Sequence, residues 1–283
     1  MFWLRTIVWI ALTIGRPFAR VLLYPITAYF LVFSRNARCA SRRYLAKVFG
    51  FPVRWSQIFR NYHTFAETIL DRVFVYSGRH SIFRLDVHGF SRLEDCLTTG
   101  RGCILVGAHI GSVDLLRTMG MLERGLSIRA LMYPENASRI LQMFRSMNPE
   151  LCADIIALGR PQSLVDVQEA LDAGSFVALL GDRWLRHEKR LRCRFLGEPA
   201  WFPEAPVRLA RLFGVPLVMF ACLHRGDAEY EVRFELLEDF RQAAPASPGT
   251  VLQRYAEALE RLCHSAPYNW FNFYEFWDQP AER

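Results

Sequence analysis

The sequence lacks the glycine-rich motifs that hold nucleotides. No GxGxxG motif follows a predicted strand, and no GxxxxGK[ST] motif occurs anywhere in the 283 residues. These absences argue against dinucleotide-dependent dehydrogenases and P-loop enzymes. A GxSxG motif is absent as well, so the chain offers no serine nucleophile of the α/β-hydrolase kind.

The sequence also lacks cysteine patterns that bind metal or form a disulfide framework. Its seven cysteines are scattered and odd in number, with no CxxC pair and no Cys/His cluster at zinc spacing. We interpret them as free thiols in a reducing compartment, and no metal site is expected.

Lysine is scarce, and arginine supplies most of the 35 basic residues, which outnumber the 28 acidic ones. The formal net charge is +7, and the chain is 52% hydrophobic and 14% aromatic. Such a composition suggests a nucleic-acid or anionic-membrane partner. We disfavour nucleic acid, because the positive charge accompanies a membrane-type N-terminus rather than a recognition helix.

No apolar run reaches the roughly 20 residues that cross a bilayer. Residues 6–15 and 17–33 are apolar but are interrupted by Arg16 and Arg20. A basic block follows, with Arg35, Arg38, Arg42, Arg43 and Lys47. A tilted span, an in-plane helix with aromatic anchors and a hairpin in the core all fit this pattern. We favour membrane association, with the basic block keeping the following residues on the cytoplasmic side.

The remaining sequence alternates between strand-like and helix-like segments. Apolar periodicity predicts a long amphipathic helix over residues 55–76. Strands are expected at 82–87, 103–106, 128–132, 154–158, 176–180, 215–222 and 229–236, with helices at 91–99, 115–122, 137–147, 162–173 and 250–265. The alternation predicts an α/β fold, with a mostly parallel sheet flanked by helices and an N-terminal apolar membrane-anchoring helical segment. We divide the chain into a membrane-associated segment, 1–50, and a domain, 51–283.

One histidine lies where ligands bind in such sheets. His109 follows the strand 103–106, and Asp114 lies in the first turn of the next helix. The carboxyl ends of parallel strands form the usual ligand crevice. A histidine there, oriented by a carboxylate, can act as a general base. The alternative is structural, with His109 capping the helix and Asp114 favoured by the helix dipole.

Two further stretches remain open to two interpretations. The segment 183–194 holds six basic residues, Arg186 among them, directly after a predicted strand. It is either a solvated charged face or a binding site for phosphate or another anion. The tail 269–277 is densely aromatic, which fits either a lid over the core or a membrane-level belt or acyl-chain wall.

Several blocks together resemble the lysophospholipid acyltransferase superfamily, and most closely the lipid A biosynthesis lauroyl/myristoyl branch. They are His109–Asp114 (HIGSVD), Tyr133–Asn136 (YPEN), Gly181–Arg183 (GDR) with Phe195–Gly197 (FLG), Phe202–Pro206 (FPEAP) and Val215–Val218 (VPLV). The resemblance covers roughly residues 85–223, plus the apolar N-terminus. Ala205 replaces the glycine of the FPEG form, and Asp114 stands where many lipid A enzymes have glutamate.

The resemblance implies acyl transfer from an acyl carrier protein or coenzyme A thioester to a hydroxyl or amine of a membrane lipid or glycolipid. It implies a site at the cytoplasmic side of a bacterial inner membrane, without a metal or organic cofactor. His109 and Asp114 would form the catalytic pair. Arg183, Glu204, Asn136, Asp182 and Arg186 would bind substrate, with Glu204 alternatively a first-turn helix carboxylate. A lipid or thioester hydrolase and a non-catalytic membrane-binding module remain the rival functions.

Overall fold

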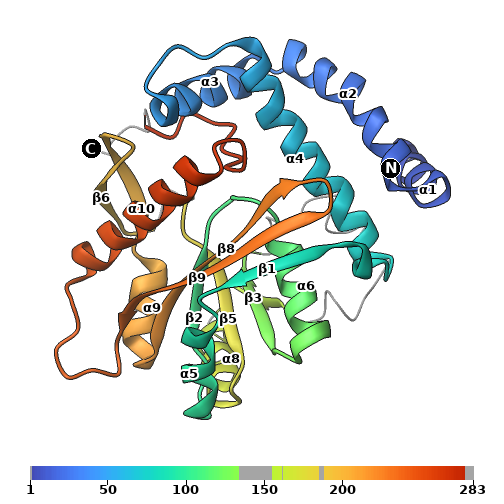
Figure 1. Ribbon diagram of the computed structural model, residues 1–283. Coiled ribbons are helices and arrows are strands. Elements are labelled where there is room, and N and C mark those ends of the chain that lie inside the picture. Colours follow the sequence, from blue (N-terminus) through green and yellow to red (C-terminus); the bar gives the residue numbers. More distant parts are fainter. Residues whose placement is uncertain (1, 134–154, 161, 185–187, 278–283) are drawn as a thin grey trace.

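A seven-stranded sheet forms the centre of the molecule (Figure 1). The computed structural model describes residues 2–133, 155–160, 162–184 and 188–277. The strands are β1 (Arg84–His88), β2 (Ile104–Gly107), β3 (Ile128–Met132), β4 (Ile155–Ala157), β5 (Phe176–Leu180), β8 (Pro216–Gly226) and β9 (Glu229–Asp239). Their order is β1-β9-β8-β2-β5-β3-β4, and only the β8–β9 pair is antiparallel. The predicted α/β fold with a mostly parallel sheet is therefore confirmed.

Helices cover both faces of the sheet. They are α4 (Trp55–Tyr76), α5 (Ser91–Thr98), α6 (Val113–Arg124), α8 (Ser163–Asp172), α9 (Ala205–Phe213) and α10 (Pro248–Ser265). Along β2 the side chains alternate between two cores. Ile104 and Val106 pack with α8, α9 and α10, whereas Leu105 packs with α5 and α6. Burial on both faces explains why β2 is a continuous apolar run.

A two-stranded hairpin stands apart from the main sheet and was not predicted. Its strands are β6 (Arg190–Phe195) and β7 (Glu198–Pro203), paired in antiparallel register. In β6, Arg192 and Arg194 are exposed, while Cys193 and Phe195 are buried. Three of the six basic residues of 183–194 thus lie in a strand, and its period of two places Arg192 and Arg194 on the exposed side.

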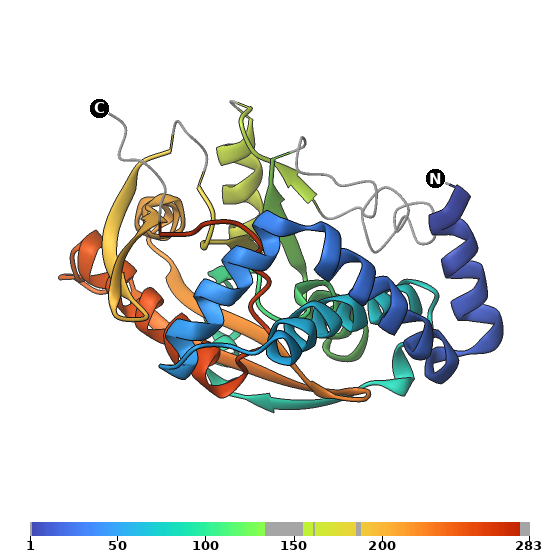
Figure 2. The ribbon, with the colours of Figure 1, turned by 90° about the horizontal axis from the view of Figure 1, so that it is seen from above.

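Three helices make up the N-terminal segment: α1 (Phe2–Ile14), α2 (Arg16–Phe33) and α3 (Arg35–Phe49). Helix α2 lies along α4 in the opposite direction, and α1 lies at the N-terminal end of α2, beside the C-terminal end of α4 (Figures 1 and 2). No single helix of the described chain is long and apolar enough to cross a bilayer. The α2–α3 pair passes by length and composition together, but it is bent by 97°.

The aromatic tail, residues 269–277, packs into the core. Trp270 is fully buried, and Phe271 and Phe276 are 5% and 2% exposed, which confirms a packed cover for these three side chains. The six described cysteines are free thiols; Cys152, like the helix expected over 137–147, lies outside the described residues.

Candidate active site

The loop after β2 holds His109 in a fixed conformation. Gly111 has φ +63°, and a Cβ at this position would lie 1.8 Å from the Cys222 carbonyl oxygen. Glycine adopts this positive φ without strain, and it has no Cβ to collide with the Cys222 carbonyl oxygen. The Gly111 N–H donates to Asn269 O (2.9 Å), and the Ser112 N–H donates to Cys222 O (2.8 Å). The loop is therefore tied to β8 and to the C-terminal tail.

Asp182 lies directly against the His109 ring. Strands β2 and β5 are parallel neighbours in which Gly107 is paired with Leu180, so the residues two positions beyond each strand meet. The Asp182 Oδ1 atom lies 2.8 Å from His109 Nδ1, and Oδ2 accepts from the His109 main-chain N–H at 2.9 Å. Trp270 Nε1 also donates to Oδ2, at 3.0 Å. Asp182 is 1% exposed, and these three donors account for its burial.

The charge of Asp182 determines which ring nitrogen of His109 carries the proton. Burial alone would raise the pKa of Asp182, but the charge and hydrogen bonds of His109, with the charge of Arg183, lower it to about 2. The carboxylate is therefore ionised at any working pH and only accepts hydrogen bonds. A neutral His109 must then carry its proton on Nδ1, which leaves the Nε2 lone pair free. The His109 side chain is 31% exposed, so the ring is open in part to a substrate.

The expectation that Asp114 orients His109 is not what the structure shows. The Asp114 carboxylate instead contacts α4, where Arg72 Nη1 lies 2.9 Å away and the Tyr76 hydroxyl donates at 3.2 Å. As the second residue of α6, Asp114 ties this helix to α4. The carboxylate on the His109 ring comes from the neighbouring strand end, at Asp182. The substrate-binding role predicted for Asp182 also does not match these contacts, since its oxygens are bound within the protein.

The other predicted site residues are only partly brought together. Arg183 adjoins the pair, with Nη2 donating to Phe271 O (3.3 Å) and the guanidinium 5.2 Å from the Tyr274 ring centre. Glu204 lies at the N-cap of α9, and its main-chain N–H donates to Lys189 O at 2.8 Å. Asn136 and Arg186 lie outside the described residues.

The C-terminal tail contacts both the loop that carries His109 and the strand end that carries Asp182. The sequence did not predict this role. The Phe271 N–H donates to His109 O (2.8 Å), and the Tyr274 hydroxyl donates to Asp182 O (3.2 Å). With the Trp270 bond to Asp182, the tail contacts both loops. An aromatic tail gives no sequence signal for such contacts, because two of the three use main-chain atoms.

Replacing Trp270 by Phe is expected to lower kcat about tenfold with a smaller effect on KM, because Asp182 loses one charge-assisted donor worth about 1.5–3 kcal/mol. Steady-state kinetics of the conversion that depends on His109 would measure both constants. Trp277→Phe is the matched control, because the Trp277 ring lies in the same cluster, 6.2 Å from Trp270, and its buried Nε1 has no hydrogen-bond partner within the described part of the chain. Equal losses in the two variants would show that ring packing, rather than the bond to Asp182, is responsible.

The described residues contain no group of three or more His, Cys, Asp and Glu side chains that could hold a metal ion.

The fold and the site define an α/β protein with a histidine–carboxylate pair at the carboxyl ends of two adjacent parallel strands. The chain matches the family model described as bacterial lipid A biosynthesis acyltransferase over residues 1–279 and belongs to this family. Membership indicates an acyltransferase with a lipid acceptor. A comparison with curated proteins gave no match.

Proposed function

We propose that this protein transfers a fatty or related acyl group from an acyl carrier protein or coenzyme A thioester to a hydroxyl or amine of a membrane lipid or glycolipid. The observation that carries the proposal is the hydrogen bond between His109 Nδ1 and the buried Asp182 carboxylate. It makes Nε2 a proton acceptor at an accessible strand end. The family match supports the acyl chemistry and the lipid acceptor.

In the proposed step, His109 Nε2 removes the proton from the acceptor hydroxyl as its oxygen attacks the thioester carbonyl. Asp182 stabilises the imidazolium that forms. The tetrahedral oxyanion requires nearby donors, and Arg183 is our candidate. When the intermediate collapses, the C–S bond breaks and the thiolate takes the proton from His109. The acceptor is itself the nucleophile, so the step requires neither a metal nor an organic cofactor.

We assign substrate contacts to Arg183, Glu204, Asn136 and Arg186. Their support is the resemblance of their sequence blocks to the superfamily and, for Arg183, its position beside Asp182. Asp114 acts in this proposal through the α4–α6 contact rather than on the His109 ring. We place the enzyme at the cytoplasmic side of the bacterial inner membrane, in keeping with a lipid acceptor and a basic, aromatic N-terminus.

A lipid profile of the native host lacking the gene tests the proposal. Extracts from cells that express the wild type, His109→Ala or His88→Ala are compared by mass spectrometry. We expect one lipid to gain a single acyl mass with the wild type and His88→Ala, but not with His109→Ala. His88 is the matched control, because it forms an exposed pair with Asp86 (3.0 Å) on β1, a strand that does not contribute to the site.

Two other results would overturn the proposal. Thioester consumption without an acylated product would indicate a hydrolase. An unchanged lipid profile with folded, membrane-bound His109→Ala would indicate a non-catalytic binding module.

A further inference from the structure

Helix α2 buries a mixed side, which includes Ala19, Leu23 and Leu31 as well as polar residues, and exposes an apolar side. Arg16 and Thr27 are among its buried residues, at 8% and 2% exposure. Eight large apolar or aromatic side chains are 45–70% exposed: Phe18, Val21, Leu22, Tyr24, Tyr29, Phe30, Val32 and Phe33. We call these eight residues the outer face of α2. An exposed apolar surface of this extent marks an interaction site.

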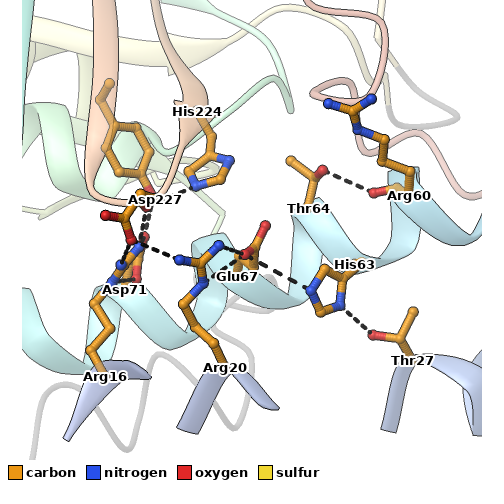
Figure 3. A network of polar contacts seen from close by, with 11 residues as sticks. Arg16, Arg20, Thr27, Arg60, His63, Thr64, Glu67, Asp71, His224 and Asp227 are labelled. Carbon is orange, nitrogen blue, oxygen red and sulfur yellow. Dashed lines mark hydrogen bonds and ion pairs between the residues drawn. The ribbon is translucent and has the colours of Figure 1, made fainter. Parts of the chain in front are cut away.

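A buried ion pair fixes the orientation of the helix (Figure 3). Arg16 Nε and Nη2 donate to Asp71 Oδ1 and Oδ2 of α4 at 2.7 and 3.0 Å, a bidentate pair. Asp71 is fully buried and also accepts from the Tyr230 hydroxyl at 2.6 Å. Rotating α2 about its axis would leave both charges unpaired in the interior, at a cost of several kcal/mol.

Three more contacts repeat this arrangement along the helix. Arg20 Nη2 lies 2.6 Å from Glu67 Oε1 on α4, and Arg20 Nη1 lies 2.7 Å from Asp227 Oδ1 at the β8–β9 turn. Two turns further on, Thr27 Oγ1 lies 3.3 Å from His63 Nδ1. Polar contacts with α4 and the β8–β9 turn thus hold α2 from Arg16 to Thr27 (Figure 3). The outer face therefore has a fixed direction.

Arg38 binds the C-terminal end of α2, and Arg42 lies beside the same indole ring as Arg38. Arg38 Nη1 donates to the carbonyl oxygens of Leu31 and Val32, at 2.6 and 2.8 Å. The guanidinium groups of Arg38 and Arg42 lie 5.2 and 5.5 Å from the ring centre of Trp55, which is 54% exposed. An exposed indole beside arginines is typical of proteins that lie at a lipid headgroup layer.

We propose that the outer face of α2 docks on the surface of an anionic phospholipid bilayer, with the helix axis parallel to that surface. The face extends from Phe18 to Phe33, so all its side chains can enter the bilayer only if the helix lies flat. The arginines beside the C-terminal end complement anionic headgroups, whereas the same face of a second copy would bring like charges together. This inference deepens the proposed membrane location, and it names the face and the lipid charge.

Flotation of the full chain with preformed vesicles tests the proposal. One vesicle type is phosphatidylcholine alone, and the other contains phosphatidylglycerol as well. We expect stronger binding to the anionic vesicles, weakened by salt. The Phe18→Glu/Phe33→Glu double variant should lower the partition coefficient roughly tenfold or more, because it removes two apolar anchors and adds repulsion. Leu212→Glu on α9, a residue that is 64% exposed, is the matched control and should bind like the wild type.

His109→Ala should bind vesicles like the wild type, and the double variant should retain acyl transfer to detergent-dispersed acceptor. Failure of docking and failure of the proposed chemistry are therefore separate results. Undiminished binding by the double variant would overturn the proposal. So would a wild-type dimer in sedimentation that the double variant abolishes, since a second copy would then occupy the face.

Discussion

Asp182→Asn is expected to lower kcat for acyl transfer by roughly 10³-fold or more, close to the loss in His109→Ala. An amide at this position can donate a hydrogen bond to Nδ1, which would place the histidine proton on Nε2. The nitrogen that faces the substrate would then no longer accept a proton. The imidazolium would also lose its buried counter-charge. Single-turnover rates with acyl donor and acceptor would measure the effect.

Asp114→Asn is the matched control for this substitution. Its carboxylate pairs with Arg72 and Tyr76, and the side chain is 24% exposed. We expect a rate within about tenfold of the wild type and a stability loss of about 1 kcal/mol, because the contact is a partly exposed ion pair. Arg72→Gln should reproduce both effects. If Asp114→Asn were as inactive as Asp182→Asn while remaining folded, Asp114 rather than Asp182 would be the carboxylate that matters in solution.

The contrast shows which part of the site the sequence could predict. The position of His109 followed from a local pattern, in which a buried strand ends just before it and a helix begins just after. The identity of its partner depends on which strand lies beside β2 and in what register. Gly107 opposite Leu180 is a contact between residues 73 positions apart in the chain. The His-x4-Asp spacing offered a nearer carboxylate, but the first turn of α6 directs it toward α4.

Two segments of the fold also differ from what the sequence predicts. The β6–β7 hairpin has the alternation of a strand, with Cys193 and Phe195 inward and Arg192 and Arg194 outward. In the N-terminal segment, hydropathy predicted an apolar helix but not its orientation. Arg16 and Arg20 interrupt the apolar runs and appear in the sequence as limits of a membrane segment. Their partners on α4 and at the β8–β9 turn are 47–211 residues away, so their burial could not be predicted locally.

Asp71→Ala is expected to lower the free energy of unfolding by about 3 kcal/mol or more, because it leaves Arg16 buried without its bidentate partner. Denaturant unfolding of the full chain would measure the loss. Asp227→Asn is the control for an exposed member of the same network. Its side chain is 72% exposed, so its contribution should stay below about 1 kcal/mol.

A compensating variant separates the role of charge from that of packing. If the cost of Asp71→Ala arises from an unpaired buried charge, Arg16→Met combined with Asp71→Leu should recover at least about half of the lost stability, since apolar replacements of buried ion pairs are often neutral. In the Arg16→Met/Asp71→Leu variant, the contacts of Arg20 and Thr27 with α4 and the β8–β9 turn remain, and they would keep the outer face directed away from the body. Vesicle binding should then survive the loss of the ion pair. If the Arg16→Met/Asp71→Leu variant were as unstable as Asp71→Ala, the ion pair itself, rather than the avoidance of an unpaired charge, would account for the lost stability.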